Sequence, residues 1–162
     1  MKKKIYSVLV ENRSGVLSKV AGLFSRRNFN IDSLAVGETD AKDVSCMTIV
    51  SSGDQRTIEQ IEKQLNKKLD VIKVKTFDEW QCVTRELMLI KVKYNKSNRR
   101  EIMEICEVMN AQIVDMSKHL MMIQICDVPE RIKLLMDMLQ GISIVEVART
   151  GTLALSKCVE NE

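Results

Sequence analysis

One order of secondary structure is repeated along this chain, and the repetition constrains the fold more than any other feature. Short strands with alternating apolar residues surround stretches whose apolar residues recur every three or four positions, as on an amphipathic helix. In the first half, the order strand, helix, strand, strand, helix, strand is predicted at residues 4–11, 16–28, 31–39, 44–51, 54–69 and 71–77. In the second half, the same order is predicted at residues 87–94, 97–110, 111–117, 120–126, 129–141 and 142–148.

Each copy is a split βαβ unit of about 75 residues, which predicts an α+β protein of two tandem ferredoxin-like βαββαβ sandwiches. We expect a first domain at residues 1–78 and a second at 79–162, joined by a polar stretch beside the lone Trp80. An apolar content of 45% supplies enough material for two cores. Because the helices cover one face of each sheet, the other face needs a cover, and we expect oligomerisation through sheet faces or edges.

The most distinctive local feature is the turn between the first strand and the first helix, at residues 8–17. It contains Asn12, Ser14 and Gly15 directly before the apolar helix begins at Val16. Free backbone N–H groups at a helix start, short polar side chains and a glycine make a corner that can hold a small anion. The helix dipole contributes about 0.3–1 kcal/mol to such binding when exposed, so the corner alone is a weak signal.

Residues for catalysis or metal binding are scarce. His119 is the only histidine and lies in a predicted hairpin turn, where a structural role is more common than catalysis. The five cysteines are scattered without a C-x-x-C pair, which predicts reduced thiols in the cytoplasm and no metal site. A net charge of +3 is too small to indicate nucleic-acid binding, and the sequence contains no apolar run of membrane-span length.

The ferredoxin-like layout serves several unrelated functions, so the fold alone does not decide between them. An RNA-recognition module would carry aromatic residues on the third strand, and residues 44–50 contain none. An electron-transfer ferredoxin would need clustered cysteines. An acylphosphatase-like hydrolase, with Arg13 and Asn30 handling an anionic substrate, remains a weak alternative. A module that senses a small molecule fits best.

Beyond these patterns, the chain resembles the small regulatory subunit of acetolactate synthase (acetohydroxyacid synthase), whose first domain is an ACT domain. The resemblance covers nearly the whole chain and rests on six segments: ENRSGVLS (11–18), GLFS (22–25), NIDSL (30–34), IEQIEKQL (58–65), TRELMLIK (84–91) and IVEVARTG (144–151).

The resemblance implies a non-catalytic subunit that activates a large catalytic subunit and confers feedback inhibition by branched-chain amino acids, typically valine. It implies a cytoplasmic homodimer paired through its ACT domains, with the effector at their interface. Thiamine diphosphate, Mg and FAD are expected on the catalytic partner only, with no cofactor, metal, membrane or nucleic acid bound by this chain. A free-standing ACT-type sensor for a different enzyme stays open as an alternative.

Carried over by position, the resemblance assigns the effector site to six residues: Asn12, Gly15, Val16, Leu17, Asn30 and Ile31. Amides of the three residues at the helix start would bind the effector carboxylate. The carbonyls of Asn12 and Asn30 would accept its ammonium group, and Leu17 or Ile31 would contact its aliphatic side chain. Arg13 is expected to face water. The preferred amino acid is not determined by the resemblance.

Overall fold

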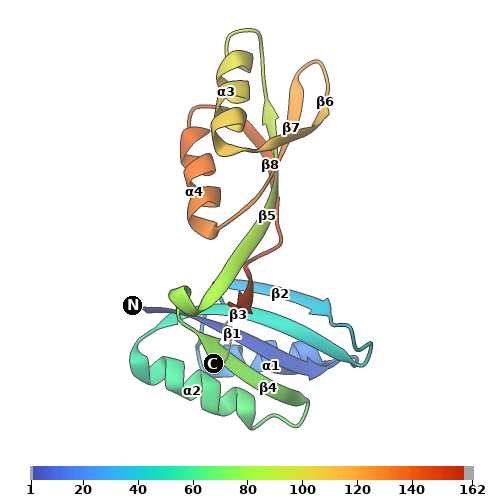
Figure 1. Ribbon diagram of the computed structural model, residues 1–162, viewed down its shortest axis with the longest axis vertical. Coiled ribbons are helices and arrows are strands. Elements are labelled where there is room, and N and C mark those ends of the chain that lie inside the picture. The colour runs from blue at the N-terminus through green and yellow to red at the C-terminus, as the bar shows by residue number, and fades with distance from the viewer. Residues whose placement is uncertain (1, 159–162) are drawn as a thin grey trace. The chain divides into compact units, whose positions relative to one another are not determined.

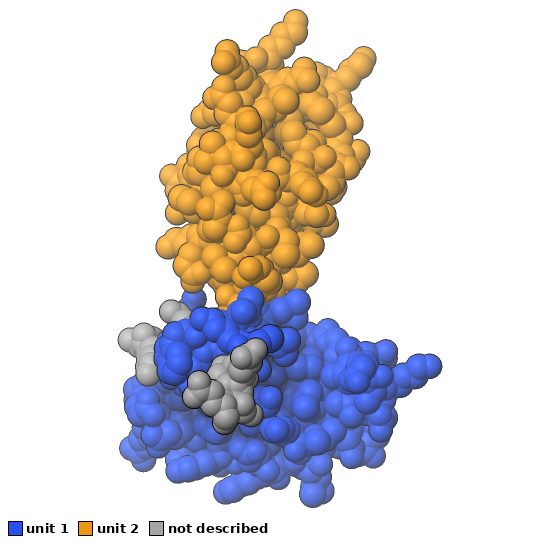
Figure 2. Space-filling model, viewed as in Figure 1, with its two compact units in different colours: residues 1–83, 152–162 blue, residues 84–151 orange. Residues whose placement is uncertain are grey.

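The computed structural model describes residues 2–158 and groups the chain into two compact units. Unit 1 comprises residues 1–83 together with 152–162, and unit 2 comprises residues 84–151, coloured blue and orange in Figure 2. Each unit contains its own sheet and its own pair of helices (Figure 1). Among the helices within residues 2–158, none combines the length and apolar character that crossing a bilayer requires.

Unit 1 is built on an antiparallel sheet in the order β2-β3-β1-β4, with both helices on one face (Figure 1). Its elements are β1 (Lys2–Glu11), α1 (Val16–Arg26), β2 (Ser33–Glu38), β3 (Val44–Gly53), α2 (Gln55–Asn66), β4 (Val71–Phe77) and the short 3-10 helix η1 (Glu79–Gln81). Both helices are shorter than predicted: α1 ends at Arg26, two residues before Asn28, and α2 ends at Asn66, three residues before Leu69. Asn28 adopts a left-handed backbone just after α1, as its residue type favours.

Alternation along β1 sorts its side chains between the two faces of the sheet. Tyr6, Val8 and Val10 are buried with the apolar faces of α1 and α2 in the main core of unit 1. Asp54 caps the start of α2: its carboxylate accepts a hydrogen bond from the Thr57 amide at 2.7 Å and so satisfies one of the open donors of the helix start.

Unit 2 repeats the pattern with the strand order β6-β7-β5-β8. Its elements are β5 (Cys82–Lys93), which begins in unit 1, α3 (Arg99–Met109), β6 (Gln112–Met116), β7 (Leu120–Asp127), α4 (Pro129–Met138) and β8 (Ile144–Arg149). Pro129 opens α4, as predicted, because its missing N–H would be unpaired there in any case. The predicted α+β class with two ferredoxin-like sandwiches is therefore confirmed.

A ninth strand, β9 (Leu153–Ser156), is absent from the sequence-based prediction. It pairs with β5, and its Ala154 packs with Ile5, Val50, Phe77 and Cys82 on the face of the unit 1 sheet opposite the helices. Its contacts therefore join residues 152–158 to unit 1, whereas the sequence-based division at 78/79 assigned them to the second domain. Four residues are too few for periodicity to reveal a strand, and its partner lies about 70 positions away.

Candidate functional site

The turn between β1 and α1 forms the corner that the sequence predicts. Gly15 stands immediately before the helix in the left-handed region, with φ 85° and ψ −9°, and no side chain caps the helix start. No hydrogen bond to the amide of Gly15 or Leu17 is found within residues 2–158, and the first turn of α1 holds no acidic residue. Two backbone donors at the positive end of the helix dipole are thus open to an anionic group.

Val16, the third predicted donor, has a different role. Its amide already donates to the Arg13 carbonyl at 3.3 Å, and its side chain is 2% exposed in the core of unit 1. Val16 therefore anchors the corner to the core, whereas the amides of Gly15 and Leu17 stay open to an anionic group.

Asn12 ties the corner to the hairpin between β2 and β3. Its Nδ2 donates to Glu38 Oε1 at 3.0 Å and to the Lys42 carbonyl at 2.9 Å, while its backbone amide donates to the Asp43 carbonyl at 2.8 Å. Within residues 2–158, no hydrogen bond to its Oδ1 atom is found. That oxygen can accept a hydrogen bond from an ammonium group beside the open amides.

An ion network that sequence reasoning missed lies beneath the corner. Asp70 accepts from Lys19 Nζ at 2.8 Å and from Arg13 Nη2 at 3.1 Å, and its carbonyl accepts the Glu11 amide at 3.0 Å. The hydrogen bond from Lys19, assisted by the charge of Arg13, lowers the pKa of the Asp70 carboxyl. Arg13 also pairs with Glu11, so this arginine is held between two carboxylates although its side chain is largely exposed. No local pattern marks Asp70, because it meets Arg13 across 57 positions of sequence.

Asn30 and Ile31 lie at the opposite end of the unit 1 sheet. The Asn30 carbonyl accepts from Ser51 Oγ at 2.7 Å, and its Nδ2 donates to Asp32 Oδ1 at 2.5 Å. Ile31 is half-buried against the helix-side core. Ser51 stands near the end of β3, whereas the Asn12 corner adjoins the start of that strand. Asp43, bonded to Asn12, and Ser51, bonded to Asn30, are eight residues apart, so at about 3.3 Å per strand residue the two groups are separated by roughly 25 Å in one chain.

This separation bears on the hydrolase alternative that the sequence left open. A hydrolase of the acylphosphatase kind would need Arg13 and Asn30 around one substrate, and the structure holds them at opposite ends of the sheet. Within residues 2–158, moreover, no three His, Cys, Asp or Glu side chains gather as a metal site would require. The two groups of site residues can meet only if a second molecule contributes one of them.

Comparison with known proteins places the chain in a family. Residues 6–73 match the model of the ACT domain of acetohydroxyacid synthase small subunits, and residues 85–158 match the model of the small subunit of acetolactate synthase. The chain is 45% identical to the acetolactate synthase small subunit of Mycolicibacterium smegmatis, covering 93% of this chain and 89% of that protein. It is 41% identical to the small subunit of acetolactate synthase isozyme 3 of Salmonella typhimurium, covering 96% of each.

A solved structure resembles the whole chain equally well. The crystal structure of the acetolactate synthase small subunit from Thermotoga maritima superposes with a TM-score of 0.91 at 37% identity, covering 98% of this chain and 99% of that one. Sequence and fold thus agree along almost the entire length, and the chain belongs to the family of small, regulatory subunits of acetolactate synthase, with an ACT domain in unit 1.

Proposed function

We propose that this chain activates the catalytic large subunit of acetolactate synthase in the cytoplasm and makes it sensitive to feedback inhibition by valine or a related branched-chain amino acid. Thiamine diphosphate, Mg and FAD are assigned to the catalytic subunit, and this chain contributes the amino-acid sensor. The observation that carries the proposal is the turn before α1, in which the amides of Gly15 and Leu17 and the Oδ1 of Asn12 all lack a hydrogen bond within residues 2–158.

A homodimer paired through β2 would complete the site. Strand β2 is an edge of the unit 1 sheet, with β3 as its neighbour there. If two copies pair antiparallel along β2 about a two-fold axis, the Glu38 end of one strand faces the Ser33 end of the other. Asn12 is hydrogen-bonded to Glu38, and Asn30 precedes Ser33 by three residues. The axis therefore brings the corner of one protomer beside Asn30 and Ile31 of its partner.

The donors and acceptors at this junction match a free amino acid. The effector carboxylate would accept from the amides of Gly15 and Leu17, and its ammonium group would donate to the carbonyl oxygens of Asn12 and of Asn30 from the partner protomer. The aliphatic side chain would lie against Leu17 and the partner's Ile31. Because one methylene in an apolar pocket is worth about 1–3 kcal/mol, valine, leucine and isoleucine should bind with graded strength.

Inhibition then requires that valine binds one arrangement of the holoenzyme better than another, since equal affinity for both would change nothing. We expect Asn12→Ala and Asn30→His each to weaken valine inhibition of the reconstituted holoenzyme while activation of the catalytic subunit survives. Asn66→Ala, on the exposed face of α2, is the matched control and should leave both properties unchanged. Unchanged inhibition in both site variants would remove the site assignment.

Mixed dimers test whether two protomers share the site. In a dimer of one Asn12→Ala chain and one Asn30→His chain, one shared site loses both residues and the other keeps both. Calorimetry should therefore find one high-affinity valine per mixed dimer, against two in the wild type and none in either parent variant. If each site lay within one protomer, both sites of the mixed dimer would be damaged and no high-affinity binding would return.

A further inference from the structure

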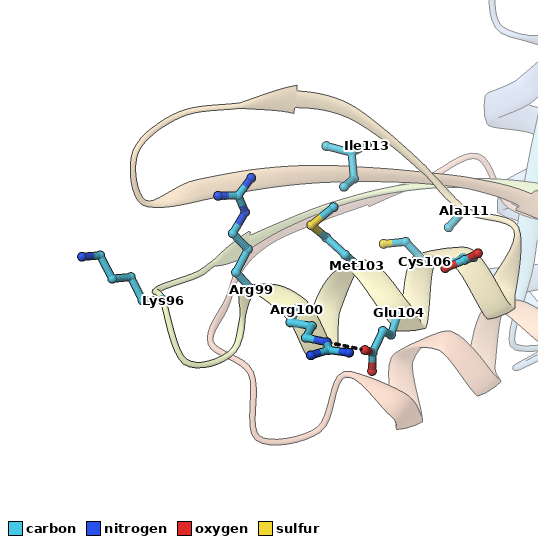
Figure 3. Close-up of a pocket in the computed structure, with 9 residues that line it drawn as sticks. Lys96, Arg99, Arg100, Met103, Glu104, Cys106, Ala111 and Ile113 are labelled. Carbon is cyan, nitrogen blue, oxygen red and sulfur yellow. Dashed lines mark hydrogen bonds and ion pairs between the residues drawn. The ribbon is translucent and has the colours of Figure 1, made fainter.

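Unit 2 carries a groove that the effector site does not use. It lies between α3 and β6 and has a volume of about 660 Å³. Figure 3 shows Arg99, Met103 and Cys106 rising from α3 on the side of β6, where Ile113 faces them. Burial raises the pKa of the Cys106 thiol, so the sulfur stays neutral and adds to the apolar floor. The floor is apolar and holds an adaptable methionine, a side chain suited to contact with another protein.

One wall of the groove is a strand edge without a strand partner. Within residues 2–158, β6 pairs only with β7, and the pairing is interrupted by a bulge between Ile113 and Asp115. The side chains of Ile113, Val114 and Met116 are between 38% and 46% exposed. The Met116 amide donates a hydrogen bond to the Asp115 carboxylate at 2.9 Å. A carbonyl group of an added strand could replace the carboxylate as the acceptor of that bond. An apolar edge of this kind is a template for an added strand.

The two ends of the groove differ in charge. Lys96 and Arg99 stand at the N-terminal end of α3, where the helix dipole is positive, and within residues 2–158 neither forms an ion pair. Arg100 is neutralised by Glu104 at 2.9 Å on the flank of the helix, as the dashed line in Figure 3 marks. Glu107 lies two turns further along α3 and also lines the groove. An occupant should thus carry its acidic residues at the end that meets Lys96 and Arg99.

We propose that an extended segment of the catalytic subunit adds to the edge of β6 as a further strand, with apolar side chains in the groove and carboxylates beside Lys96 and Arg99. The inference rests on the proposed function, which supplies the partner. Backbone hydrogen bonds along β6 would give affinity, and the alternate side chains over Met103 and Ile113 would give specificity.

A second copy of this chain fits the groove less well. In a second copy, the helix-side face of β6 is covered by that copy's own α3, so its side chains are not free to fill the groove. A lone segment of the partner has both faces free.

The test uses the full chain and the purified catalytic subunit. Lys96→Glu combined with Arg99→Glu should raise the Kd of the complex about tenfold or more, because buried carboxylates of the partner would then face like charges. The matched control is Arg56→Glu combined with Lys133→Glu, which changes net charge equally at exposed positions on α2 and α4 and should change the Kd by less than about twofold. In the wild type, hydrogen exchange of the amides of residues 112–116 should slow when the catalytic subunit binds.

Three other outcomes of this experiment would contradict the inference. If the wild-type complex forms but β6 amides exchange at the free rate, or both double variants bind alike, the groove is not the docking site and the proposed function stands. If β6 amides become protected in the free chain as its concentration rises, a second copy occupies the edge and the inference is overturned. If no complex with the catalytic subunit forms at all, the proposed function fails, and this inference fails with it.

Discussion

Substitutions at Gly15 separate the backbone requirement of the corner from its role in binding. At φ 85°, an L residue with a side chain costs roughly 1–2 kcal/mol relative to glycine, and asparagine costs less because it tolerates the left-handed region. A Cβ built on Gly15 meets no atom within 4 Å, so no steric clash adds to that cost. For a domain of this size, 1 kcal/mol corresponds to about 4–8 °C in Tm. Gly15→Ala should therefore lower the Tm of unit 1 by about 5–15 °C, and Gly15→Asn by clearly less.

Valine inhibition should respond in a different order. The space around the Gly15 Cβ position is where the effector would approach the main chain, so any side chain there obstructs it. Both Gly15→Asn and Gly15→Ala should raise the half-inhibitory valine concentration about tenfold or more, equivalent to about 1.4 kcal/mol. Thermal denaturation and valine titration of the reconstituted holoenzyme measure the two effects.

Gly22→Ala is the control, because Gly22 lies inside α1 with only Arg26 Nη2 near its Cβ position, at 4.0 Å. It should raise stability by about 0.5–1 kcal/mol and leave inhibition unchanged. Should Gly15→Ala keep the wild-type Tm, the left-handed conformation is not required. If valine inhibits the holoenzyme with Gly15→Asn as strongly as it inhibits the wild type, the effector does not approach this residue.

Two further predictions concern ion pairs. The Glu86 side chain is 4% exposed and accepts two hydrogen bonds from Arg149, at 2.7 and 2.9 Å. Arg149→Ala should therefore lower the free energy of unfolding, measured in urea, by about 2–4 kcal/mol, and replacing both residues by leucine and methionine should restore most of the lost stability. A loss below about 0.5 kcal/mol in Arg149→Ala would show that water replaces the arginine. The pKa of Asp70 lies below its ordinary 3.8 in the folded chain, so its contribution to stability is present above that pH and is lost as the pH falls through the lowered value. The stability difference between the wild type and Asp70→Asn in urea should hence be constant at neutral pH and vanish in strong acid, and a difference independent of pH would contradict the role of the Lys19 and Arg13 pairs.

The order of helices and strands was readable from the sequence because each element carries its own periodicity. Alternation in β1 and the helical spacing of α1 reflect burial against a core that any such sandwich must have. The corner was readable for the same local reason, since Asn12, Gly15 and the helix start are contiguous in the chain. The role of Val16 could not be predicted in this way. Its side chain is buried and its amide is already hydrogen-bonded because of the turn that the folded chain adopts.

Contacts between distant positions were decided only by the tertiary structure. Asp70 joins the corner through Arg13 and Lys19, and β9 packs against one face of the first sheet, yet neither contact leaves a trace in any local window of sequence. The separation of Asn12 from Asn30 belongs to the same class: residues on either side of one helix lie at opposite ends of the sheet because α1 runs back along its length. Local patterns depend on which face a residue presents to the core, whereas these pairings depend on how the chain closes over many residues, which periodicity does not encode.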